Sequence, residues 1–392
     1  MRISRTDKSL LAEWWFTVDR PLLAAILALI AVGLLLSLAA SPVVALKKGL
    51  PAFYFVERHG AYAALGLFVM LVVSMMGPRT IRRLAAVLFF GGLAVMVLVL
   101  LTGEEINGAR RWLRFAGLSL QPSELAKPGF AVLSAWAFAE SARRTDMPAL
   151  ALAIAFYVAF AALLMLQPDV GQVLLITALW GALLFLSGRP IAWSAGLFAA
   201  GAGLLAGAYH VLPHVRQRID RFLVPPTGET SQTDRAFQSF LEGGFFGRGP
   251  GEGTIKNILP DARTDFIFAV VAEEYGVLAC LILVAIFAYV VLRALARTFG
   301  EPEPFARHGV AGLALLVGLQ AVMNMAVNVG LVPAKGITLP FISAGGSSHL
   351  AMCIACGMLL ALTRRRPDPE RLKMPGLTVK ARRLRPYGTG AP

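Results

Sequence analysis

The chain has 392 residues, of which 57% are hydrophobic and only 15% are charged. A soluble domain carries roughly 25% charged residues, so this composition excludes an ordinary soluble protein. The formal net charge of +14 could suit nucleic acid, but most of the cations lie between apolar runs or near the C-terminal end. No nucleic acid partner is therefore expected.

Apolar runs of the length that a bilayer requires, about 20 residues, recur along the whole chain. The sequence therefore predicts an all-α polytopic membrane protein with about ten transmembrane helices. Their approximate positions are 21–45, 60–76, 83–102, 123–140, 148–167, 170–187, 191–212, 266–294, 309–332 and 340–362.

The first apolar run, 21–45, follows a basic segment over residues 1–20. Ser37–Ala40 weakly resembles a signal-peptide cleavage site. The apolar region of a secretory signal has only about 7–15 residues, and this run is longer. We expect it to be retained as the first span.

Basic residues fall in alternate connections, on the same side as the two basic termini. The positive-inside rule makes that side the cytoplasm. These residues are Arg79, Arg82, Arg83, Arg143, Arg144, Arg189, Arg293, Arg297 and Arg307. We therefore expect a cytoplasmic N-terminal segment over 1–20, a transmembrane domain over 21–363, and a disordered basic cytoplasmic tail over 364–392.

The connection 103–122 carries cations on the predicted outer face, where they are normally scarce. They are Arg110, Arg111 and Arg114, next to Trp112, and Lys335 falls on the same face. Arginine binds phosphate through two parallel hydrogen bonds, so this cluster could hold an anionic group. The alternative is that one short connection is simply an exception to the charge rule.

The segment 214–264 is the one long connection, and it is predicted to lie outside, in the periplasm. Its positive and negative charges nearly cancel, and it contains the glycine-rich run Gly243–Gly253. A connection this long in a compact protein is usually functional or disordered. Its aromatics and glycines suggest a lid that rests on the membrane.

Asp265 lies where the long connection turns into an apolar run, with Arg263 close by in sequence. Burial raises the pKa of a carboxyl group and a nearby cation lowers it. Asp265 could thus be tuned as a base that removes a hydroxyl proton. A helix N-cap formed by Thr264 and Asp265 is an equally weighted alternative.

Glu273 and Glu274 follow Asp265 by eight and nine residues, and a helix cannot direct all three side chains to one cavity. One of the two glutamates is expected to pair with a basic group in a structural role. Glu124 and Lys127 can pair in the same way at i, i+3, and Asp169 could cap a helix between two spans.

The last predicted span is interrupted near its start. The residues there are Lys335, Ser343, Gly345, Gly346, Ser347 and Ser348. Clustered hydroxyls can bind a polar ligand and glycines allow a close backbone approach, although small residues also simply pack helices. Cys280, Cys353 and Cys356 lie in apolar runs without histidine at metal spacing, so we expect buried thiols and no metal site.

Five motifs occur in one order along the chain. They are Asn107–Trp112, Gln121–Glu124, Gln167–Gly171, Leu259–Phe268 followed by two glutamates, and Lys335–Ser348. In this the chain resembles the SEDS family, which includes FtsW, RodA and SpoVE. Lys335 before Gly336 is similar to the FtsW branch.

The resemblance implies a peptidoglycan glycosyltransferase that polymerises lipid II on the periplasmic face of the bacterial inner membrane, at the division septum. It implies that Asp265 is the essential aspartate, and that a class B penicillin-binding protein (FtsI-like) and other divisome membrane proteins are partners. The expected substrate-binding residues are Asn107, Arg110, Arg111, Trp112, Glu124, Lys127, Lys335, Ser343, Gly345, Gly346, Ser347 and Ser348.

Arg110, Arg111 and Lys335 would stabilise the pyrophosphate leaving group. A divalent cation, magnesium or manganese, could assist them, although no carboxylate cluster demands one.

The chain departs from the family pattern at three positions. Arg263 stands where the family usually has His, Ala344 where it has Tyr, and Asp261 where Glu is common. Three alternatives to the septal polymerase stay open: a lipid II flippase or transporter, a RodA-type elongation polymerase, and a non-catalytic division scaffold. The sequence shows no self-similarity of the kind that transporters with inverted repeats have.

Overall fold

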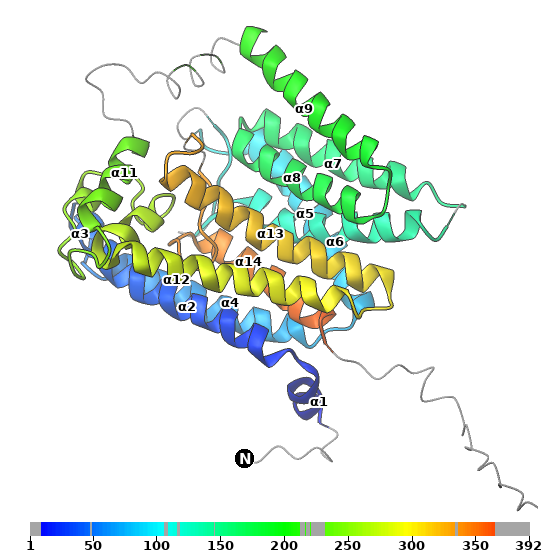
Figure 1. The fold of residues 1–392 in the computed structure, drawn as a ribbon, viewed down its shortest axis with the longest axis horizontal. Coiled ribbons are helices and arrows are strands. Elements are labelled where there is room, and N and C mark those ends of the chain that lie inside the picture. The colour runs from blue at the N-terminus through cyan, green and yellow to red at the C-terminus, as the bar shows by residue number, and fades with distance from the viewer. Residues whose placement is uncertain are drawn as a thin grey trace, which may run out of the picture.

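The computed structural model describes residues 9–47, 49–105, 109–115, 118–144, 146–211, 216, 220, 232–333 and 336–364. Long helices lie side by side in one bundle, and their connections gather at its two ends (Figure 1). The all-α prediction is confirmed. The described residues add to the helices a two-stranded antiparallel hairpin that pairs Leu113 with Leu120.

The elements follow one another along the chain. They are α1 (Leu10–Thr17), α2 (Arg20–Ala40), α3 (Pro42–Lys47), α4 (Tyr54–Ser74), α5 (Pro78–Thr102), β1 (Leu113–Phe115), β2 (Leu118–Leu120), α6 (Pro122–Ser141), α7 (Ala149–Leu166), α8 (Val170–Leu186), α9 (Ile191–Val211), α11 (Gln232–Gly243), the 3-10 turn η1 (Ile255–Asn257), α12 (Ile267–Thr298), α13 (Pro304–Asn328) and α14 (Gly346–Leu362).

Within the described part of the chain, six helices are long and apolar enough to cross a membrane: α2, α4, α5, α7, α12 and α13. Helices α8 and α14 are apolar but shorter, with 17 residues each. These helices make the chain a multi-pass membrane protein. The total of about ten spans stays a prediction.

The bundle is apolar inside and outside. Helices α6 and α14 are buried along almost their whole length, whereas α2, α4, α5 and α12 present large apolar side chains outward. Leu35, Phe68, Val87 and Leu292 are more than half exposed. Lipid would cover such a surface, and the polar groups are left to the interior and the ends.

Helix α12 is broken at Gly276, which the sequence did not predict. Gly276 has φ 80° and ψ 175° inside the predicted span 266–294. A side chain there would meet the carbonyl oxygen of Phe245 at 2.3 Å. The part after the break, 277–298, is about 33 Å long, which suffices for a bilayer.

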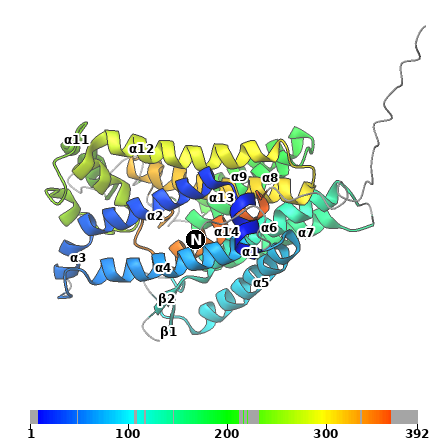
Figure 2. The ribbon, with the colours of Figure 1, turned by 90° about the horizontal axis from the view of Figure 1, so that it is seen from below.

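The long outer connection folds onto the part of α12 that precedes this break. It contains α11 and η1, and α11 packs against α12 at the same end of the bundle as α3 (Figures 1 and 2). The Glu273 carboxylate accepts hydrogen bonds from three backbone N–H groups, those of Thr254, Ile255 and Lys256, at 2.5–3.0 Å. The Lys256 ammonium pairs with Glu274.

The prediction of a structural pair at these glutamates is confirmed.

Four large apolar side chains on α11 and the turn after it are half-exposed or more: Phe237, Leu241, Phe245 and Phe246. A lid resting on the membrane stays a prediction.

The last span is shorter than predicted. Helix α14 begins at Gly346, not near residue 340, and 336–345 is not helical. Phe341 has a positive φ of 65°, which a right-handed helix does not allow. At the other end of the chain, the predicted segment 1–20 contains the short helix α1, and 365–392 of the predicted tail lie outside the described residues. The three cysteines are free and buried, as expected.

Candidate active site

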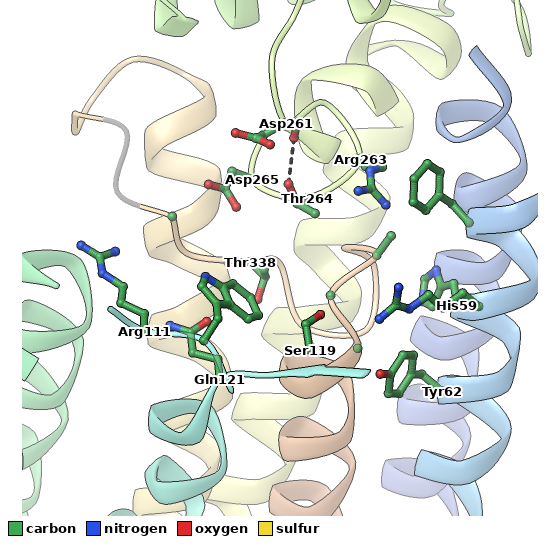
Figure 3. A pocket seen from close by; sticks show the side chains of 17 residues that line it. His59, Tyr62, Arg111, Ser119, Gln121, Asp261, Arg263, Thr264, Asp265 and Thr338 are labelled. Atoms are coloured by element: carbon green, nitrogen blue, oxygen red, sulfur yellow. Dashed lines mark hydrogen bonds between the residues drawn. The ribbon is translucent and has the colours of Figure 1, made fainter. Parts of the chain in front are cut away.

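A cavity of about 450 Å³ opens at the end of the bundle where α12 begins. Four separate parts of the chain line it: the start of α4, the hairpin with its flanks, the turn before α12, and the segment 336–346. Figure 3 shows these parts facing one another around the cavity. Of the predicted site residues, it contains Asp265, Arg111, Trp112, Gly345 and Gly346.

Asp265 is presented by a tight turn. Asp261 adopts a left-handed φ of 54°, and its carbonyl accepts hydrogen bonds from the N–H groups of Thr264 and Phe266. The helix begins at Ile267 with Phe266 as its N-cap and no side-chain cap bond. The alternative that Asp265 caps α12 is therefore wrong, and its carboxyl is left to line the cavity.

Two buried asparagines of α13 hold the Asp265 backbone. Nδ2 of Asn324 donates to the carbonyl oxygens of Asp265, at 2.8 Å, and of Ile337, at 2.6 Å. Nδ2 of Asn328 donates to the same Asp265 carbonyl at 2.9 Å, and its Oδ1 accepts from the N–H of Ala269 at 3.0 Å. The turn, α12 and the segment 336–345 are thereby fixed to one helix.

Burial raises the pKa of the Asp265 carboxyl to about 7, and the negative charges of Asp261, Asp169 and Glu124 add to the rise. The expectation that Arg263 would lower the pKa of Asp265 does not hold. Figure 3 shows the Arg263 side chain directed toward α4, away from the Asp265 carboxyl. A carboxyl group with a pKa near neutrality suits a general base.

Arg111 reaches the cavity from the segment before β1. Its guanidinium donates to the backbone carbonyls of Gln167, at 2.8 Å, and of Pro168, and lies 3.5 Å from the Asp169 carboxylate. Asp169 also accepts from the N–H of Gln172 and so caps α8, as predicted. Arg111 is thus held in place by three contacts at the rim.

The other predicted outer cations are placed differently. Arg110 lies 3.8 Å from Glu105, both being about half exposed, and it is not among the cavity residues. Asn107 and Lys335 lie outside the described residues. Gly336, which follows Lys335, has a positive φ of 67°, and a side chain added to it would approach Asp265 Oδ2 at 3.7 Å.

Glu124 and Lys127 pair at 2.8 Å, fully buried behind the cavity wall. Lys127 also donates to Oε1 of Gln320 on α13, and Glu124 accepts from Nε2 of Gln172, both at 2.8 Å. The predicted pairing is confirmed. Neither residue lines the cavity, so their contact with substrate is not supported by their position.

The serines near the last span are also buried. Ser343 donates to the carbonyl of Thr264 at 2.5 Å and accepts from the N–H of Leu339 at 2.8 Å, which ties this segment to the turn of Asp265. Ser348 bonds to Thr338 at 2.6 Å, and Ser347 is buried. Position 346 requires glycine, because the Cβ of any other residue at this position would lie 2.4 Å from the Tyr62 ring.

The sequence reasoning missed the α4 side of the cavity. Arg58, His59 and Tyr62 line it there, and the Arg263 guanidinium lies 3.7 Å from the centre of the Phe55 ring. Burial lowers the pKa of Arg263, and the neighbouring positive charge of Arg58 lowers it further. The missed signal was Arg58–His59 at the start of an apolar run, since ionisable groups near membrane depth are functional candidates.

The chain matches the family model described as cell cycle protein (FtsW, RodA and SpoVE) over residues 20–367. It is 45% identical over 365 residues to a Caulobacter vibrioides protein named "Probable peptidoglycan glycosyltransferase FtsW", covering 93% of this chain and 94% of that one. A Geobacter metallireducens protein of the same name is 35% identical over 357 residues, covering 88% and 95%.

The fold of the chain is also similar to that of solved structures. A chain from work described as "Structural coordination of polymerization and crosslinking by a peptidoglycan synthase complex" has a TM-score of 0.74 at 28% identity, covering 88% of this chain and 97% of that one. The rod shape determining protein RodA of Thermus thermophilus has a TM-score of 0.66 at 27% identity, covering 90% and 99%.

Proposed function

Because the chain belongs to the FtsW, RodA and SpoVE family of cell cycle proteins, we propose that it is a peptidoglycan glycosyltransferase, which polymerises lipid II during septal cell-wall synthesis. Relatives that carry this activity in their names match nearly the whole chain. The observation that carries the mechanism is the Asp265 carboxyl, raised in pKa and lining a cavity that also contains arginines.

The reaction joins two lipid-linked sugars. Asp265 removes the proton from the 4-hydroxyl of the acceptor sugar, and that oxygen attacks the anomeric carbon of the donor. The bond from this carbon to the pyrophosphate breaks as the new glycosidic bond forms, with inversion. The undecaprenyl pyrophosphate leaves with the electron pair.

The cations of the cavity can stabilise the negative charge that develops on the leaving pyrophosphate. Arg111 on one side and Arg263 on the other are positioned to stabilise negative charge on pyrophosphate oxygens. Lys335, next to Gly336 in sequence, is proposed to add a third cation. The lipid tails would lie against the apolar outer faces of the bundle.

A divalent cation fits a site of this kind. The described residues contain no group of three or more histidine, cysteine, aspartate or glutamate side chains that could hold a metal ion. Magnesium is commonly bound by one or two carboxylates together with substrate phosphates, so Asp265 and Asp261 with a pyrophosphate would suffice. The ion would neutralise charge on the leaving group.

We place the cavity on the periplasmic side of the bacterial inner membrane and both termini in the cytoplasm, because the basic connections lie at the opposite end of the bundle. A class B penicillin-binding protein is the proposed partner. The similarity to a complex that coordinates polymerization with crosslinking supports this pairing.

The test is polymerisation of lipid II by the purified chain with its penicillin-binding partner. Asp265→Asn should lower the rate by about 10²–10⁴-fold, the usual contribution of a general base. Asp146→Asn, the same change at an exposed aspartate outside the cavity, should retain most of the activity. Partner binding and the elution profile on gel filtration serve as controls for folding.

Full activity of Asp265→Asn would show that the base is wrongly assigned. If the wild-type chain moved lipid II across a vesicle bilayer but formed no polymer with its partner present, the transporter alternative would replace the enzyme.

A further inference from the structure

A second cavity, of about 310 Å³, lies at the opposite end of the bundle from Asp265. It is formed between the connection from α1 to α2, the end of α12 and the end of α14. Three arginines line it, Arg20, Arg293 and Arg297, together with Asp19. In the proposed orientation this end faces the cytoplasm, and the activity described above does not use it.

The charges of this cavity do not balance. Asp19 has a nearly fully buried side chain, and Arg293 and Arg297 approach its carboxylate to 3.2 Å and 2.5 Å. These contacts use Nε and Nη2 of both arginines, so Nη1 of each is not engaged by Asp19. With Arg20 the four groups carry a net charge of +2.

Among the described residues, one further charged pair adjoins the cavity through Thr17, which lines it. Glu13 on α1 lies 3.2 Å from the Arg364 guanidinium, which also donates to Thr17. That pair is neutral by itself. An anion entering the cavity would therefore meet arginines that are a quarter to a third exposed, while the Asp19 carboxylate beneath them is covered.

The rim of the cavity has the side chains typical of a membrane interface. The Arg20 guanidinium lies 4.7 Å from the centre of the Trp15 ring and 5.7 Å from that of Phe16. Leu10, Leu11, Trp15 and Phe16 of α1 are exposed. A short helix with exposed leucine and aromatic side chains beside arginines is expected to lie at the level of the lipid headgroups.

We propose that this cavity binds the phosphate of an anionic phospholipid of the cytoplasmic leaflet. Basic pockets between membrane helices on this side of a bilayer recognise such headgroups, and the guanidinium fork matches a phosphate. The acyl chains would continue along the apolar faces of α2 and α12. A bound lipid would join α1 and α2 to α12, which is far from both in the sequence.

The test uses the purified full-length chain and thermal unfolding. Phosphatidylglycerol, added to the detergent-solubilised protein, should raise the unfolding midpoint more than phosphatidylcholine with the same acyl chains. In a binding titration, Arg20→Gln combined with Arg293→Gln should weaken phosphatidylglycerol binding by about 30-fold, since each arginine near the surface contributes roughly fivefold. Arg297 is kept so that Asp19 retains a partner.

Arg144→Gln is the matched control. Arg144 is 60% exposed at the same end of the bundle, outside the cavity, and its removal should leave the lipid effect unchanged. If the double variant does not fold, Arg20→Gln alone, which does not touch Asp19, should still weaken binding about fivefold.

Equal binding of phosphatidylglycerol by the variants and the wild type would overturn the proposal. Stabilisation by inorganic phosphate in phosphatidylcholine, equal to that by phosphatidylglycerol, would also overturn it and indicate a site for free phosphate. None of these measurements requires polymerase activity, so the result is independent of the proposed catalytic mechanism.

Discussion

At the residue scale, the base is defined by what surrounds its carboxyl and by what holds its backbone. Asp265 lines the cavity close to other carboxylates, and its own carbonyl is fixed by Asn324 and Asn328. Residues close to Asp265 in the sequence cannot supply this arrangement alone, since the asparagines follow about 60 residues later. The neighbouring carboxylates therefore affect the proton affinity of Asp265, and the asparagines fix its position. The two effects can be tested separately.

The raised pKa of Asp265 predicts the pH dependence of the reaction. The base acts only when deprotonated, so kcat/KM should fall as the pH drops through about 7. Asp261→Asn removes a neighbouring negative charge, so the acidic limb of the pH profile, where kcat/KM falls, should move to lower pH. Initial rates from pH 5.5 to 8.5 with both proteins check this. A limb that stays in place in the variant would argue against Asp265 as the titrating group.

The same shift has a consequence for stability with a defined sign. Between the usual pKa of an aspartate and about 7, the folded chain holds the Asp265 proton and the unfolded chain releases it. Stability from this group is therefore present at low pH and is lost as the pH rises to 7.

Asn324→Asp should lower kcat by about a hundredfold with little change in KM, because a displacement of the base of about 1 Å can cost that much. The new side chain has nearly the same shape but loses the Nδ2 group that donates to Asp265 and Ile337. Gln238→Glu, an amide-to-carboxyl change at an exposed position of α11, is the control. A parallel loss of kcat and thermal stability in both variants would indicate general unfolding instead.

At the element scale, the outer connection and α12 form one unit. Gly243 and Gly247 bring α11 and its following turn against the α12 backbone, and the break at Gly276 gives them room. The backbone N–H of Val277 donates to the carbonyl of Gly244 across this contact. The connection that ends in Asp265 is therefore anchored to the helix that Asp265 precedes.

Gly243→Ala should separate α11 from α12. The added methyl group would lie 1.9 Å from the carbonyl oxygen of Ala272, and such overpacking costs about 1–3 kcal/mol. We expect a lower unfolding midpoint in detergent and reduced polymerisation. Gly91→Ala on α5, where a methyl group would meet nothing within 4 Å, is the control and should unfold like the wild type.

At the scale of the whole molecule, a buried polar chain links the helices behind the cavity. It runs from Gln172 on α8 through Glu124 and Lys127 on α6 to Gln320 on α13. Gln320 donates in turn to the carbonyl of Thr338, which lines the cavity. The chain couples the packing of the central helices to the shape of the site.

Lys127→Met should destabilise the protein by about 3–5 kcal/mol, because it leaves the Glu124 carboxylate buried without its cation. The double variant Glu124→Gln with Lys127→Met should be more stable than the single one, since it removes the unpaired charge. Unfolding midpoints of the three proteins in one detergent decide this. Equal loss in both variants would mean that the pairing contributes little.

The helical architecture could be predicted from the sequence, because a bilayer imposes a length and a composition on every helix that crosses it. The apolar runs each correspond to a helix. One of the two adjacent glutamates, Glu274, pairs with a lysine, Glu124 pairs with Lys127, and Asp169 caps a helix, as predicted. The ordered motifs also indicated the family, which the comparisons confirm.

Which residues share the cavity depends on how the helices pack, and the sequence did not predict it. The packing brought Arg58 and His59 of α4 to the site, turned Arg263 away from Asp265, and placed Glu124 and Lys127 behind the wall. These outcomes depend on contacts between segments far apart in the chain, such as the hold of Asn324 on Asp265. Hydropathy and spacing describe one segment at a time, so they cannot specify which side chains several packed helices direct into one space.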